Sequence, residues 1–292
     1  MRIVLAGAFG HLGQDVLCAA VRDGHDVLAT DLHATALDPA HVPSLIGPGS
    51  WTVQEADLTQ PSQVQGLCEG ADAVITTVGL PKASPTASCY DIDYQANLNL
   101  LNEAERARVK KFLYVSVLKA DGDPSVPMLD AKNRFEQELR ASGIPYVIFR
   151  PTGYFYDIAH VFKPMVKKGK VTLLNPNVQA NVIDTSDLAN FMLEHLHDTD
   201  QAFEVGGTET YTYDQIARIF FAAAGKKPSV RRAPAWLFDI LASIARRRNN
   251  GKEAVIRFSK WTLTHPMVAE IRYGQKSFKE YVRDCYSTKV GE

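Results

Sequence analysis

The N-terminal half of the chain alternates short apolar runs with amphipathic segments. Apolar runs predict strands at residues 3–6, 26–30, 73–78, 111–117 and 145–149, and alternating apolar and polar residues predict another at 51–55. Apolar positions at helical spacing predict helices between them, at residues 12–22, 61–68, 90–107 and 130–142. Buried strands that alternate with helices indicate a doubly wound parallel sheet covered on both faces, a Rossmann-type α/β fold.

The pattern becomes less regular after Pro151. Short strands are predicted at 169–174, 178–183 and 202–205, and helices at 186–195, 212–224, 234–247 and 278–286. We therefore expect a Rossmann domain over residues 1–150 and a smaller mixed α/β region over 151–292. Segments at about 178–205 are expected to return to the main sheet.

Three glycines stand where the first predicted strand turns into the first predicted helix. Gly7, Gly10 and Gly13 have the spacing G-x-x-G-x-x-G. Such a turn lets backbone N–H groups and the positive end of a helix approach a pyrophosphate. An ordinary glycine turn is the alternative, but the flanking strands and helix favour a dinucleotide site. The residues expected to line it are Gly7, Phe9, Gly10, His11, Leu12 and Gly13.

An acidic residue, Asp31, ends the second predicted strand. A carboxylate at this distance behind the glycine loop can accept hydrogen bonds from the hydroxyls of the adenine ribose. The same negative charge repels a 2′-phosphate. We therefore predict NAD as the cofactor in preference to NADP, although a turn or cap residue is the other interpretation of Asp31.

Composition excludes several other classes of protein. The formal net charge is −1, which favours neither nucleic acid nor an acidic membrane, and no apolar stretch has the length of a membrane span. The four cysteines lie far apart and suggest no metal site, and no signal peptide is recognisable, so a cytoplasmic protein is expected. The basic run Arg246 to Arg248 is interpreted as a solvated helix end, with a patch for an anion or partner as the alternative.

Seven short segments resemble, in order, the atypical short-chain dehydrogenase/reductase superfamily, with its extended, NmrA-like and isoflavone-reductase-like branches. These segments are the glycine loop, Asp57-Leu58, Thr77-Val78-Gly79, residues 94–97, residues 112–117, the Arg150-Pro151 turn and residues 182–189. The resemblance covers nearly the whole chain. It implies that Asp57, Leu58, Val78 and Gly79 lie along the cofactor and that Pro151 opens the substrate region.

The catalytic signature of that superfamily is only half present. The family pattern is Tyr-x-x-x-Lys, in which the tyrosine is the acid or base and the lysine holds the nicotinamide ribose. Lys132 fits the lysine, but Met128 stands four residues earlier and cannot donate a proton. Lys132, Ser116 and Tyr154 are therefore the candidate catalytic residues, and either Tyr154 or Tyr156 would be the replacement proton donor. Aromatic packing is the simpler explanation for each of these two tyrosines.

Three hypotheses of function follow. The first is an NAD(P)-dependent oxidoreductase acting on a small carbonyl compound, a quinone or a nucleotide-sugar. The second is a non-catalytic NAD(P)-binding sensor or scaffold, like the NmrA-like regulators, which Met128 favours. The third is an assembly factor or accessory subunit that keeps the nucleotide for stability. The helices predicted at 90–107 and 130–142 would pair two subunits in a homodimer, as in many relatives.

Overall fold

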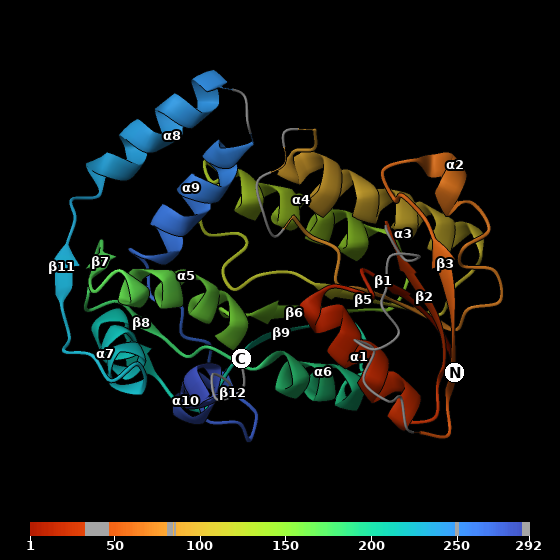
Figure 1. The fold of residues 1–292 in the computed structure, drawn as a ribbon. Helices are drawn as coiled ribbons and strands as arrows, with labels where there is room; N and C mark the ends of the chain where they lie inside the picture. The colour runs from red at the N-terminus through yellow and green to blue at the C-terminus, as the bar shows by residue number, and fades with distance from the viewer. Residues whose placement is uncertain (33–46, 81–83, 85, 249–250, 288–292) are drawn as a thin grey trace.

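An eight-stranded parallel sheet forms the centre of the computed structural model, which describes the chain except residues 33–46, 81–83, 85, 249–250 and 288–292 (Figure 1). The strand order is β12-β9-β6-β5-β4-β1-β2-β3. The strands of this sheet are β1 Arg2–Ala6, β2 Asp26–Asp31, β3 Ser50–Glu55, β4 Ala73–Thr76, β5 Lys111–Val115, β6 Tyr146–Pro151, β9 Gln201–Gly206 and β12 Ile271–Arg272. The predicted fold class is thus confirmed.

The order of the strands determines where a ligand can bind. β1 pairs with β2 on one side and with β4 on the other, so that Ile3 lies opposite both Val27 and Ala73. The order in which successive strands are added to the sheet reverses between β1 and β4, and Rossmann-type folds bind their ligands at the carboxyl ends of the strands beside this point. The last three residues of β1 before the loop are fully buried, as expected of a central parallel strand.

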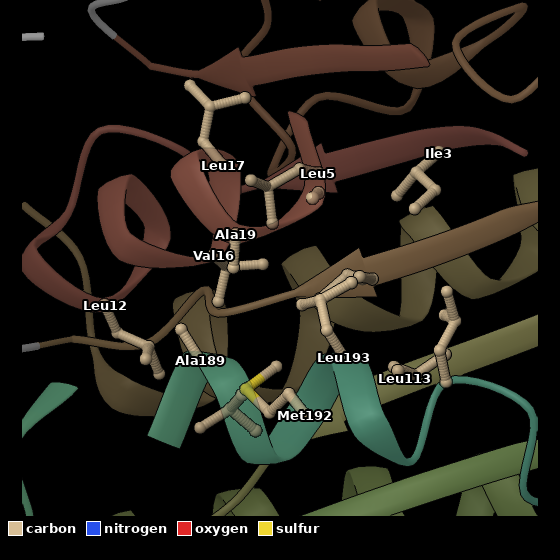
Figure 2. Close-up of a cluster of buried hydrophobic side chains, with 14 of the residues drawn as sticks. Ile3, Leu5, Leu12, Val16, Leu17, Ala19, Leu113, Ala189, Met192 and Leu193 are labelled. Atoms are coloured by element: carbon tan, nitrogen blue, oxygen red, sulfur yellow. The ribbon is translucent and has the colours of Figure 1, made fainter. Parts of the chain in front are cut away.

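Helices cover both faces of the sheet. α1 His11–Arg22 and α6 Thr185–Glu194 cover one face, and α2 Pro61–Val64, α3 Asn97–Arg106 and α4 Pro127–Ala141 cover the other. Figure 2 shows Leu12 and Val16 of α1 meeting Ala189 and Met192 of α6. This packing ties the helix behind the glycine loop to the C-terminal half of the chain, because each apolar helix face is buried against the other and the sheet.

The residues after β6 build a second core beside the first. Its helices are α5 Phe155–Lys167, α7 Tyr213–Ala223, α9 Lys252–Thr262 and α10 Phe278–Ser287, and α8 Trp236–Arg248 lies outside it. Its short strands are β7 Val171–Leu173, β8 Gln179–Ala180, β10 Tyr211–Thr212 and β11 Val230–Arg232. β9 joins the main sheet by pairing with β6. Among the described residues, no helix combines the length and apolar character needed to cross a membrane.

The structure differs from the sequence pattern in several places, among them the short strands β10, β11 and β12, which were not predicted. The helix predicted at 61–68 lasts one turn, because Gly66 takes a φ of 84° that ends it. The helix predicted at 90–107 opens as a π-helix, Tyr90–Ala96, before α3. α5 and α9 were not predicted; α5 contains Pro164, a residue that sequence reasoning treats as a helix breaker.

Candidate cofactor-binding and active site

The glycine loop between β1 and α1 is held by close backbone packing. Gly7 has a φ of 74°, and a Cβ placed on it would lie 2.8 Å from Thr77 Oγ1. A Cβ on Gly13 would lie 2.0 Å from the carbonyl oxygen of Gly7. The hydroxyl of Thr77 in turn donates to the carbonyl of Gly7 at 3.0 Å. Both positions therefore require glycine for the turn itself.

Gly10 differs from the other two glycines. A Cβ placed there would meet only the Gly7 carbonyl oxygen, at an ordinary 3.5 Å. Gly10 is also the N-cap of α1, and no described residue caps the helix with its side chain. The first N–H groups of α1 are consequently available to an anion, and the loop fits the pyrophosphate of a dinucleotide.

Asp31 is tied to the glycine loop. Its carboxylate accepts hydrogen bonds from the backbone N–H of Phe9 at 3.1 Å and of Leu32 at 2.8 Å. Two carboxylate oxygens offer about four acceptor positions, so these two bonds leave room for ribose hydroxyls. The adjoining residues 33–46 lie outside the described part, and their sequence contains no lysine or arginine.

Polar side chains brace the next two candidate segments. Asp57 accepts both the backbone N–H and the hydroxyl of Thr59, at 2.9 and 2.7 Å, while the carbonyl of Leu58 accepts from Asn99 of α3. Val78 donates its N–H to Thr76. These bonds fix the backbone just beyond the carboxyl ends of β3 and β4, where the resemblance puts the cofactor.

Asn97 explains the π-helix before α3. Its side chain accepts the hydroxyl of Thr76 at 2.7 Å and donates to the carbonyls of Val78, Ile92 and Asp93. A π-helix leaves backbone carbonyls to be satisfied by other groups, and such turns are common at functional sites. The hydrogen bonds of Asn97 thereby hold the π-helix against the end of β4.

A buried ion pair lies next to this turn. Lys132 Nζ of α4 is 3.0 Å from Asp93 Oδ1, and the side chains are 13% and 0% exposed. Asp93 also accepts the N–H of Leu80 at 3.2 Å. A Cβ placed on Gly79 would lie 2.9 Å from that Asp93 oxygen and 3.2 Å from Lys132 Nζ. Gly79 is therefore needed so that the pair can lie against the backbone after β4.

Two tyrosines share the surroundings of Lys132. Its Nζ lies 5.6 Å from the ring centroid of Tyr114, whose hydroxyl is buried without a hydrogen-bond partner among the described residues. Burial raises the pKa of Tyr154, and the positive charge of Lys132 opposes that rise. For Lys132 itself, burial favours a lower pKa, but the neighbouring oxygens of Tyr114 and Asp93 outweigh it and the pKa is raised. Lys132 therefore keeps its charge at neutral pH.

Ser116 belongs to a different network. Its hydroxyl donates to Glu136 at 2.6 Å, and Glu136, 1% exposed, also accepts the guanidinium of Arg150 at 2.6 Å. The arginine before Pro151 thus joins β6 to α4, while Pro151 itself lies buried at the end of β6. Because the hydroxyl proton of Ser116 is already donated to a carboxylate, this side chain can offer a ligand only its lone pairs.

Aromatic residues of α5 lie against the start of α1. The rings of His11 and Tyr156 stack with their centroids 3.6 Å apart. Asp157, the next residue of α5, has a raised pKa because of burial, which the positive potential of His11 and His160 partly offsets. This contact places the start of α5 beside the glycine loop, so the C-terminal region borders the site.

The structure thus brings most of the sequence-predicted site residues to one edge of the sheet. The glycine loop, Asp31 and Gly79 lie at the carboxyl ends of β1, β2 and β4, and Lys132 is in contact with Gly79. Sequence reasoning missed Asp93 and Glu136. The only available signal was their position, Asp93 four residues before Asn97 and Glu136 four residues after Lys132, at a spacing that shares a helix face.

The NAD(P)H-binding family model matches residues 7–199. The chain belongs to this family. Solved structures of an epimerase, a quinone oxidoreductase and a triphenylmethane reductase, all below 20% identity, share its fold. One is an NADPH-dependent quinone oxidoreductase of Escherichia coli complexed with NADPH, with a TM-score of 0.71, 18% identity and coverage of 97% of this chain and 99% of that one.

Other relatives have different activities. Triphenylmethane reductase of Citrobacter sp., complexed with NADP(H), has a TM-score of 0.73 at 16% identity, over 98% of this chain and 100% of that one. Photosystem II assembly factor Ycf39 of Trieres chinensis is 24% identical over 84% of this chain and 76% of its own length. Divinyl chlorophyllide a 8-vinyl-reductase of Zea mays is 25% identical over 81% of this chain and 63% of its own length. At these identities the solved structures bear on the fold alone.

Proposed function

We propose that this protein is an NAD(P)-dependent oxidoreductase that acts on a small carbonyl compound, a quinone or a nucleotide-sugar. The observation that carries the proposal is the position of Lys132, which buried Asp93 holds at 3.0 Å against the backbone of Gly79. The positive charge of Lys132 also opposes the rise that burial causes in the pKa of Tyr154. A lysine with a purely structural role on a surface helix needs neither a buried carboxylate partner nor a neighbouring glycine that leaves room for its ammonium group.

The residues have separate roles in this proposal. When bound, the dinucleotide supplies or accepts a hydride. The N–H groups at the start of α1 bind its pyrophosphate, and Lys132 binds the hydroxyls of its nicotinamide ribose. Asp93 positions Lys132. Tyr154 Oη holds the proton that a substrate oxygen receives, and the charge of Lys132 makes that proton easier to release.

Variants of three tyrosines test the proton donor. Y154F is expected to lower kcat by about 10²–10⁴ with NADH affinity retained, because only the phenol proton is lost. Y94F is the matched control, since the hydroxyl of Tyr94 donates to Glu138 on the exposed side of α4. NADH and NADPH oxidation would be followed against quinones and carbonyl compounds, with nucleotide-sugars assayed for conversion. An active Y154F together with an inactive Y114F would assign the proton to Tyr114 and refute this role.

NAD(H) is the cofactor that we propose. Asp31 is held by two backbone N–H groups at the end of β2, where its charge repels a 2′-phosphate. Fluorescence titration is expected to show tighter binding of NADH than of NADPH, and D31N is expected to narrow the difference. Wild-type protein that prefers NADPH would refute this assignment. NADPH is the alternative to test, because two solved structural neighbours contain NADPH or NADP(H).

A nucleotide-binding sensor or assembly factor is the second candidate. Met128 of α4 favours it, because this position carries the tyrosine in the superfamily's catalytic pattern, and several relatives are photosystem II assembly factors. This candidate predicts tight NAD(H) binding with no turnover of any compound tested. The homodimer stays a prediction, and none of the large exposed apolar side chains among the described residues belongs to α3 or α4.

A further inference from the structure

α8 carries an apolar face that the rest of the described chain leaves uncovered. Only two of its residues are buried, Ala242 and Ala245. Five large apolar side chains are instead between 38% and 56% exposed: Trp236, Leu237, Ile240, Leu241 and Ile244. Their spacing of one, three and four residues puts them along one side of the helix. Figure 1 shows α8 at the edge of the molecule, reached from β11 and packed on α9.

The segment around this helix is strongly basic. Residues 226–253 hold eight lysines and arginines against two acidic residues, a net charge of +6 in a chain whose formal net charge is −1. Four of the basic residues precede the apolar stripe in the sequence, and four follow it: Lys226, Lys227, Arg231 and Arg232 before it, and Arg246, Arg247, Arg248 and Lys252 after it. The acidic Asp239 is paired with Lys260 of α9 at 2.6 Å and does not offset this charge at the stripe.

We propose that α8 docks on the surface of an anionic lipid bilayer. The Trp-, Leu- and Ile-rich stripe would enter the headgroup boundary, and the flanking arginines and lysines would meet lipid phosphates. The helix has 13 residues and is therefore about 20 Å long, which suits a helix lying in the interface and not one that crosses a bilayer. A second copy of this chain fits the stripe less well, because its own residues 226–253, with a net charge of +6, would face an equal charge.

Vesicle sedimentation tests the proposal with the full-length protein. The probes are vesicles of phosphatidylglycerol mixed with phosphatidylcholine, and of phosphatidylcholine alone. The wild type is expected to sediment with the anionic vesicles and weakly or not at all with the neutral ones. I240S/I244S is expected to abolish this binding, because both side chains are exposed in the stripe. R247Q/R248Q is expected to weaken it about 30-fold, near fivefold for each charge.

Controls separate docking from misfolding and from general charge. K279Q/R283Q removes two exposed positive charges from α10, which packs on α5 and α7 at the other end of the second core, and is expected to leave vesicle binding unchanged. Thermal unfolding of each variant shows that it folds. Absence of wild-type sedimentation, or equal sedimentation of I240S/I244S, would overturn the proposal. So would a concentration-dependent dimer that I240S/I244S abolishes without any vesicle binding.

Discussion

Replacement of Asp93 by asparagine isolates the contribution of the buried ion pair. The substitution keeps the size of the side chain and an oxygen for the N–H of Leu80, but it removes the charge 3.0 Å from Lys132 Nζ. Lys132 is then a cation, 13% exposed, with an amide in place of its carboxylate. Loss of one partner of a buried pair costs about 3–5 kcal/mol, because the remaining charge stays desolvated without compensation. The midpoint of thermal unfolding should fall by roughly 6–15 °C.

The pH dependence of stability gives a second signature. In the wild type the pKa of Lys132 is raised, so its contribution is fully present below the unfolded-state pKa and is lost only as pH rises through the folded-state pKa. In D93N, burial acts with less opposition and lowers the Lys132 pKa below its unfolded value of about 10.4. The unfolded state then binds more protons, and the stability of D93N should rise between neutral pH and about pH 10.

Urea unfolding of D93N, K132M and the double variant measures the coupling between the two residues. The double variant should be more stable than either single variant, since no lone buried charge remains. D72N is the control, because Asp72 pairs with Lys110 on the surface, where Lys110 is 78% exposed, and its loss should be too small to resolve. Additive effects of D93N and K132M, or a D93N loss no larger than that of D72N, would refute the reasoning.

Three further outcomes are expected. Gly13→Ala should prevent stable folding, because its Cβ would lie 2.0 Å from the Gly7 carbonyl oxygen. Gly10→Ala should lower the free energy of unfolding in urea by only about 1 kcal/mol, and it should weaken NADH binding in a fluorescence titration. Tyr114→Phe should lower stability in urea by about 1 kcal/mol, because the phenol oxygen is one of the groups that favour the charged form of buried Lys132. An unchanged stability would show that this contact contributes nothing. Glu136→Gln should cost about 1–3 kcal/mol in the same assay, because Arg150 loses its 2.6 Å partner and keeps only the longer contacts to Asp121 and Glu204, at 3.5 and 3.6 Å. A neutral result would show that the pair contributes nothing.

The central strands of the main sheet could be predicted from the sequence because they carry continuous apolar runs, whereas the two-residue edge strand β12 could not. Ile3–Ala6 and Ala73–Thr76 are buried on both faces, and only an uninterrupted apolar segment suits that position. The C-terminal region gave a weaker pattern. α5 buries an apolar stripe at helical spacing, Phe155, Ala159, Phe162 and Val166, but Pro164 inside it argues against a helix in the sequence. α9 has one buried residue, Trp261, and so gives little apolar signal.

Some residues of the candidate site could likewise be predicted from the sequence, and others could not. Gly7 and Gly13 were found because backbone packing demands glycine at those positions, which leaves a fixed spacing in the sequence. Asp93 and Glu136 left no such trace. A buried carboxylate is recognised only through the cation that pairs with it, and Lys132 and Arg150 come from elements 39 and 14 residues away in the chain. Such pairings follow from tertiary packing and not from any local pattern.

Met128 illustrates how far a missing motif residue constrains function. The superfamily pattern puts a tyrosine one turn before the lysine on the same helix, and here that position cannot donate a proton. Tyr154 stands at the start of α5, a different element, and yet the charge of Lys132 acts on its phenol. A proton donor needs a position and a pKa, and neither depends on which helix supplies it. The absence of Tyr-x-x-x-Lys from one helix is therefore a weaker argument against catalysis than the sequence alone implied.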